Sequence, residues 1–202
     1  MEKILKEFRH EKVLLIYRCG SYAFGTTTDT SDEDFIVVLK DFKGLMHMGD
    51  EGKEYFIFGL PFWKDKMEFS DDLAEYYEVH NDEIFSFPHT VLYIDKEIEP
   101  LIEEYRARFL DNYKVWLTKV VRYFARFIEL GDYEKRYYHL VRIKHIVENY
   151  KTTGTFSLEL SPEIIEWIKA YKAEENRVIY KAVIDDALQY LKAESERQGG
   201  TT

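Results

Sequence analysis

Apolar residues in the first hundred positions of the chain are grouped in short runs, and each run is bounded by charged residues or glycine. Runs of about four to eight apolar residues between such boundaries are typical of buried β-strands. The predicted strands cover 12–19, 34–40, 55–58 and 66–69, and residues 90–94 form either a last strand or an extended connection. This part of the chain is therefore expected to fold around a small sheet.

Polar segments separate these runs. Residues 1–10 predict a short amphipathic helix. Gly44, Gly49 and Gly52 punctuate a polar segment that is expected to be a mobile loop. Ser70 is followed by two acidic residues and predicts the start of a helix, because a serine N-cap and early negative charges both suit the positive end of the helix dipole.

After a boundary near Glu99–Pro100, apolar residues recur every three or four positions, which is the period of an amphipathic helix. One such stripe ends at Gly131 and another near Gly154, and glycine is the common residue just past a helix end. The Ser-Pro-Glu sequence at 161–163 predicts another helix start, and a last helix is expected over 178–191.

The whole pattern predicts an α/β fold: a small mixed sheet with helices on one side, followed by a helical subdomain. We expect the sheet-containing domain to span 1–99 and the helical subdomain to span 100–197, with a flexible tail at 198–202.

Composition agrees with a folded protein that is free of disulfides. Hydrophobic residues make up 46% of the 202 positions, which is ample material for a core. The single cysteine, Cys19, ends an apolar run and is expected to be a buried structural thiol. The charged N-terminus does not resemble a signal peptide, and no run is long enough to span a membrane, so we expect a cytoplasmic location.

Charge limits the choice of partners. The formal net charge of −10 argues against broad, nonspecific binding of nucleic acid, because affinity for a phosphate backbone comes largely from cationic side chains. The same charge would suit a small cationic substrate, so the charge alone leaves the partner open.

The clearest chemical pattern joins the first two strands. Gly20 and Ser21 end the first strand, where the missing Cβ and the hydroxyl predict close approach of phosphate oxygens to the chain. Asp32 and Asp34 open the second strand and point the same way, because side chains alternate faces along a strand. Two adjacent carboxylates on one face favour a hard divalent cation, and magnesium commonly shares its ligands between carboxylates and substrate phosphates.

The order Gly20-Ser21, ten residues, Asp32-x-Asp34 resembles the signature of the DNA polymerase beta nucleotidyltransferase superfamily. Within it, the segments 31–34, 64–70 and 138–142 resemble predicted nucleotidyltransferases of the RNA repair pathway polymerase beta family. The resemblance implies transfer of a nucleoside monophosphate from an NTP, such as ATP, to a hydroxyl, with an RNA end as the acceptor. It also implies two ions, Mg²⁺ or Mn²⁺, about 4 Å apart.

That mechanism needs a third carboxylate from a later strand. By resemblance, Glu68 within Met67-Glu68-Phe69 is expected to supply it, and Asp65 is the alternative. The two are out of phase on a strand, so both cannot face one metal without a bulge. A surface acid on a strand edge is the other interpretation of Glu68.

Three basic residues are expected near the triphosphate. Arg18 directly precedes the glycine, and its alternative role is a strand-edge salt bridge. His139 and Arg142 share a helix face within a segment that resembles the family's helical motif. A partly buried structural histidine is the alternative for His139.

Two other functions remain open from the sequence. The same chemistry could modify a protein or a small cationic molecule instead of RNA. A noncatalytic nucleotide-binding module would follow if the third carboxylate were missing.

Overall fold

The computed structural model describes residues 6, 8, 10–29, 31–67, 81–87, 89–128 and 137–197. The predicted helix over 1–10 lies mostly outside these residues, and the predicted helix start at Ser70, the stop at Gly131 and the tail at 198–202 lie wholly outside them.

Five strands form one mixed sheet in the order β3-β4-β2-β1-β5. The strands are β1 (Val13–Arg18), β2 (Glu33–Leu39), β3 (Leu45–Asp50), β4 (Lys53–Gly59) and β5 (Val91–Ile94). β2 and β4 run parallel, whereas the other neighbours are antiparallel. The predicted strands over 12–19, 34–40 and 55–58 are confirmed, and 90–94 is a strand.

The expected loop around Gly49 is instead strand β3, so that prediction is wrong. β3 and β4 form a hairpin in which Asp50 pairs with Lys53 across a two-residue turn. Glu51 and Gly52, the two turn residues, have φ of 50° and 77°, the backbone that a tight hairpin turn of this kind requires. Gly44 and Gly52 therefore bound a strand and do not punctuate a loop.

The predicted strand over 66–69 is also wrong in its described part, because Lys66 and Met67 end helix α2 (Leu60–Met67). Trp63 and Met67, one helical turn apart, are both buried against the sheet. Helical spacing of these two apolar residues, and not strand alternation, fills the core here.

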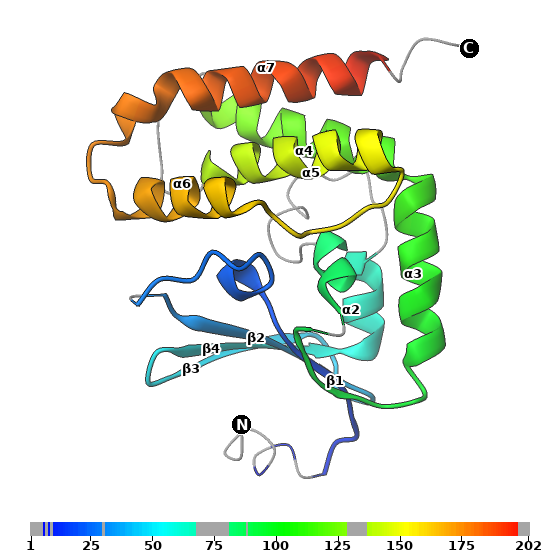
Figure 1. Ribbon diagram of the computed structural model, residues 1–202. Helices are drawn as coiled ribbons and strands as arrows, with labels where there is room; N and C mark the ends of the chain where they lie inside the picture. Colours follow the sequence, from blue (N-terminus) through cyan, green and yellow to red (C-terminus); the bar gives the residue numbers. More distant parts are fainter. Residues whose placement is uncertain are drawn as a thin grey trace.

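Helices cover one face of the sheet (Figure 1). α2, the short 3₁₀ helix η3 (Asn81–Ser86) and α3 (Glu99–Asp111) pack on the face that carries Tyr17, Ile36 and Val38. The opposite face carries its own buried cluster, made of Ile16, Phe35, Val37, Leu39, Tyr55 and Ile57.

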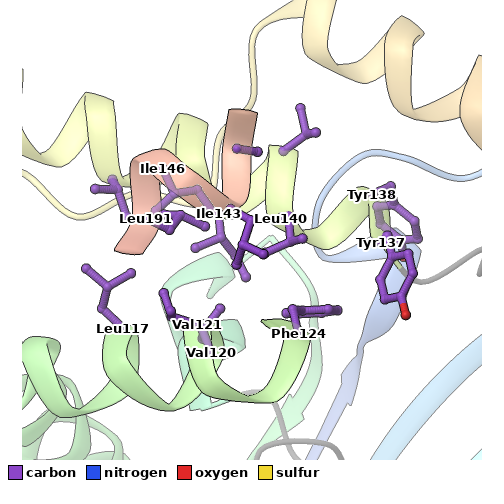
Figure 2. Close-up of a cluster of buried hydrophobic side chains, with 14 of the residues drawn as sticks. Leu117, Val120, Val121, Phe124, Tyr137, Tyr138, Leu140, Ile143, Ile146 and Leu191 are labelled. Atoms are coloured by element: carbon purple, nitrogen blue, oxygen red, sulfur yellow. The ribbon is translucent and has the colours of Figure 1, made fainter. Parts of the chain in front are cut away.

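The second half of the chain is helical, as predicted. It comprises α4 (Tyr113–Ile128), α5 (Tyr138–Thr153), α6 (Pro162–Ala173), the 3₁₀ helix η5 (Arg177–Tyr180) and α7 (Lys181–Arg197). Apolar side chains of α4, α5 and α7 interlock in one core (Figure 2). Gly154 ends α5 with φ of 71°, and Ser161 caps α6 by accepting a hydrogen bond from the Ile164 amide. Both helix boundaries match the sequence prediction.

One prediction about the last helix is wrong. Val178 and Ile179 lie in η5, before α7 begins, and their side chains are exposed. Within the described residues, we find no helix with the length and apolar character needed to cross a membrane.

Candidate active site

Gly20 and Asp34 are in direct apposition at the ends of β1 and β2. The short 3₁₀ helix η1 (Gly20–Tyr22) follows β1, and the Cys19 amide donates to the Asp34 carbonyl. Gly20 has φ of 59°, and a Cβ at this position would lie 2.7 Å from the Asp34 Oδ2 atom. Only glycine fits here without displacing the carboxylate.

The Gly20 amide already has a partner within the protein. It donates a 2.8 Å hydrogen bond to Oε1 of Glu83, a buried residue of η3. Gly20 thus has two roles in the structure besides the expected one. Gly20 admits Asp34 and is held in place by Glu83.

Asp32 and Asp34 lie at the start of β2, where Ser31 shapes the preceding turn through a 2.9 Å hydrogen bond from the Thr28 amide to its hydroxyl. Asp34 is half-buried and Asp32 is exposed. Burial raises the pKa of Asp34 above its ordinary value of 3.8, and the negative charges of Asp32 and Glu54 raise it further. The two aspartates and Glu54 therefore form one electrostatic cluster.

Glu54 is a candidate functional residue that the sequence interpretation missed. It lies on β4 and pairs in parallel register with Asp34 on β2, so the two occupy equivalent positions on neighbouring strands. A sequence signal was present, because Glu54 precedes the apolar run 55–58 as Asp34 precedes 35–38. Glu54 is therefore a further candidate for the third carboxylate, beside the two taken from the sequence.

Of the two residues proposed from the sequence for that role, only Asp65 is described by the structure. Asp65 is exposed on helix α2, not on a strand. Glu68 lies outside the described residues.

Ser21 lies beside a second residue that the sequence interpretation missed. Lys172, near the end of α6, donates hydrogen bonds from Nζ to the Ser21 hydroxyl at 2.8 Å and to the Thr26 carbonyl at 3.0 Å. Its ammonium also lies 4.5 Å from the centre of the Tyr138 ring. The positive charge of Lys172 acts on Asp34 as well, lowering its pKa. A helix far along the sequence thus delivers a cation to the Gly20–Ser21 turn.

Arg18 lies on the other face of the sheet from Asp34. Its guanidinium is 3.5 Å from Glu33 and stacks over the Tyr22 ring at 4.3 Å. Glu33 also pairs with Lys53 at 3.2 Å. Glu33 therefore points away from its neighbours Asp32 and Asp34, as strand alternation predicts, and the structure brings Arg18 to Glu33 and not to the carboxylate cluster.

Residues of α5 pack against the segment 20–24. Arg142 is fully buried, with its guanidinium 3.6 Å from the centre of the Phe24 ring. Burial raises the pKa of Tyr138 to about 12, so it stays neutral, and its ring lies beside the Lys172 ammonium that bonds Ser21. The half-buried His139 ring packs on Tyr138 at a centroid distance of 4.1 Å. These contacts join α5 to the segment 20–24.

The carboxylates suit a cation held jointly with a substrate. Among the residues that the structure describes, no three His, Cys, Asp or Glu side chains lie close enough to hold a metal by themselves. Asp32, Asp34 and Glu54 supply carboxylate oxygens, and the charges of Asp32 and Glu54 both act on Asp34. Magnesium commonly takes one or two carboxylates and completes its shell with water and phosphate oxygens, so this open set fits that ion.

Comparison with known families agrees with this geometry. The model of the nucleotidyltransferase domain family matches residues 1–118, more than half of the 202-residue chain. The matched segment includes the sheet, the Gly20–Ser21 turn and the carboxylates, whereas Lys172 lies beyond it. No curated protein sequence matches the chain significantly. The chain therefore belongs to the nucleotidyltransferase domain family, within the DNA polymerase beta superfamily, and is a transferase whose substrate is a nucleoside triphosphate.

Proposed function

We propose that this protein uses divalent metal to transfer a nucleoside monophosphate from an NTP to the hydroxyl of an RNA end. The observation that carries the metal dependence is the cluster of Asp32, Asp34 and Glu54, in which Asp34 is half-buried beside two further carboxylates. Such a cluster is costly without a counter-charge, and a cation bound with a triphosphate supplies one.

Different side chains contact the triphosphate and the metal ions. Ser21 and Lys172 contact the triphosphate, since one hydroxyl and one ammonium meet at the turn that follows β1. Asp32, Asp34 and Glu54 hold Mg²⁺ or Mn²⁺. When bound, these ions neutralise the charge of the phosphates and lower the pKa of the attacking hydroxyl. The reaction joins the acceptor oxygen to the α-phosphorus, breaks the bond to the bridging oxygen and releases pyrophosphate.

The RNA acceptor is supported by resemblance. The segments 31–34 and 138–142 resemble the RNA repair pathway polymerase beta family, and both lie beside the segment 20–24, where Asp34 approaches Gly20 and Arg142 stacks on Phe24. A protein or a small cationic molecule is the second candidate acceptor, and the net charge of −10 would suit the cationic molecule.

A labelling experiment tests both the chemistry and the acceptor. The protein is incubated with each α-³²P-labelled NTP and Mg²⁺, together with total RNA or with protein extract. We expect label in RNA, and Asp34→Asn and Glu54→Gln should each lower the rate at least about 100-fold by removing a ligand charge. Glu33→Gln is the matched control, because Glu33 neighbours Asp34 but faces the opposite side, and it should keep the rate within about threefold.

The other outcomes are equally informative. Label that enters protein alone would replace the RNA acceptor with the second candidate. NTP binding without any transfer, unchanged in Asp34→Asn, would overturn the catalytic proposal in favour of a binding module.

A further inference from the structure

The hairpin of β3 and β4 surrounds the Glu54 carboxylate with two residues of β3. His47 places Nε2 2.5 Å from Glu54 Oε2. Gly49 is the cross-strand partner of Glu54, and a Cβ there would lie 3.2 Å from Oε1 and 3.3 Å from Oε2. The carboxylate thus lies over a position without a side chain and is held by a ring two residues away.

The His47 ring is itself held in a fixed plane. It stacks on Phe56, its cross-strand partner, with ring centroids 4.7 Å apart and an angle of 6° between the planes. Because an ionised carboxylate only accepts hydrogen bonds, the hydrogen of this contact belongs to Nε2 of His47. Phe56 therefore fixes the ring, and the ring fixes one oxygen of Glu54.

His47 also belongs to the electrostatic surroundings of the cluster. Asp32 and Glu54 act on Asp34 as negative charges, whereas His47 and Lys172 act as positive ones. Of these residues, His47 lies within hydrogen-bond distance of the candidate cation ligand Glu54. Histidines and carboxylates that hydrogen-bond to metal ligands orient them, and their loss typically weakens metal binding about 10–100-fold.

We propose that His47 is a positioning residue, whose Nε2–H···Oε2 hydrogen bond orients Glu54 so that Oε1 is left to bind the divalent cation. This inference rests on the proposed function, since it takes Glu54 to be a cation ligand. It gives strand β3, which carries His47, the role of orienting a carboxylate. The carboxylates on β2 and β4 would bind the cation.

Two substitutions separate the hydrogen bond from the ring. His47→Phe keeps a ring to stack on Phe56 but removes the donor. His47→Gln keeps a donor at a similar reach but removes the ring. Binding of Mn²⁺ to the 202-residue chain is measured by electron paramagnetic resonance, in the presence of a nonreactive α,β-methylene triphosphate. Glu54→Gln is measured in parallel, and thermal melting confirms that each variant is folded.

We expect His47→Phe to weaken Mn²⁺ binding about 10–100-fold and His47→Gln to stay within about threefold of the wild type. In transfer assays, His47→Phe should raise the Mg²⁺ concentration needed for half-maximal rate and leave the KM for NTP unchanged. This split would not arise from a general loss of structure.

Two results would overturn the inference alone. In one, Glu54→Gln weakens Mn²⁺ binding while His47→Phe does not. In the other, His47→Gln is as impaired as His47→Phe, which would show that a hydrogen-bond donor at this position does not account for the effect. If Glu54→Gln itself binds Mn²⁺ like the wild type, the cation role of Glu54 in the proposed function falls, and the role of His47 falls with it.

Discussion

At the scale of single residues, the site depends on the absence of one atom. Gly20 has a positive φ and leaves no room for a Cβ beside the Asp34 carboxylate. The glycine therefore serves the backbone conformation and the placement of Asp34 at once.

Gly20→Ala separates these two contributions. The methyl group must displace Asp34 Oδ2, so we expect transfer activity to fall at least about tenfold, together with a loss of about 1 kcal/mol in the free energy of unfolding from the left-handed backbone. Gly154→Ala is the control, because its φ is 71° and nothing lies within 4 Å of its added Cβ. That variant should lose similar stability but keep its activity, as judged by urea unfolding and labelled NTP transfer. Equal activity of the two alanine variants would contradict the steric argument.

The sequence predicted Asp34 but missed Glu54, although the two precede similar apolar runs. Asp34 follows the Gly20–Ser21 turn after a short interval along the chain, and this spacing is part of the recognised sequence pattern. Glu54 reaches it only because β4 pairs in parallel with β2 after β3 has turned back. Strand order is information from tertiary structure, and local periodicity does not contain it.

At the scale of elements, helix α6 brings the helical half of the chain to the turn after β1. Its N-cap, Ser161, was predictable from local sequence, whereas the contact of Lys172 with Ser21 was not. Nothing near Lys172 distinguishes it from an ordinary exposed lysine such as Lys169. The difference lies in the packing of α6 over the segment 20–26.

Lys172→Met tests this contact. Loss of a charged hydrogen bond to phosphate costs about 1.5–3 kcal/mol, so we expect the KM for NTP to rise about 10–100-fold with a smaller change in kcat. Lys169→Met is the control, since Lys169 lies on the same helix and pairs with Glu166 at 3.3 Å. Steady-state kinetics of both variants make the comparison. A fall in kcat at unchanged KM would refute the role of Lys172 in binding.

At the scale of the whole molecule, the acidic balance is concentrated in part around the site. The protein carries a net charge of −10, and three carboxylates gather at the ends of β2 and β4. Without cations, the neighbouring carboxylates repel one another and lower the stability of the folded protein. This is the cost of an arrangement that suits cation binding.

Asp34→Asn is expected to raise the stability of the metal-free protein at pH 7. Burial, with the charges of Asp32 and Glu54, raises the pKa of Asp34 in the folded protein above 3.8. Ionisation of Asp34 therefore penalises the folded state at neutral pH, and the penalty disappears as the pH falls through the raised pKa to below 3.8. Thermal unfolding in EDTA should show a higher midpoint for the variant at pH 7, and the difference should shrink toward about pH 3.5.

Mg²⁺ with a nonreactive NTP analogue should reverse this order, because the ligands bind only the folded wild type well. A variant that is less stable than the wild type at pH 7 in EDTA would contradict the proposed repulsion among the carboxylates.

The matched family segment ends at residue 118, inside α4, yet Phe24 is buried in the core of α4, α5 and α7, and the cation at Ser21 comes from α6. A fragment that ends at residue 118 would keep the three carboxylates. It would lose the helices that bury Phe24 and the lysine that contacts Ser21. The C-terminal helices therefore complete, from outside the matched segment, the surroundings of the turn that lies beside Asp34.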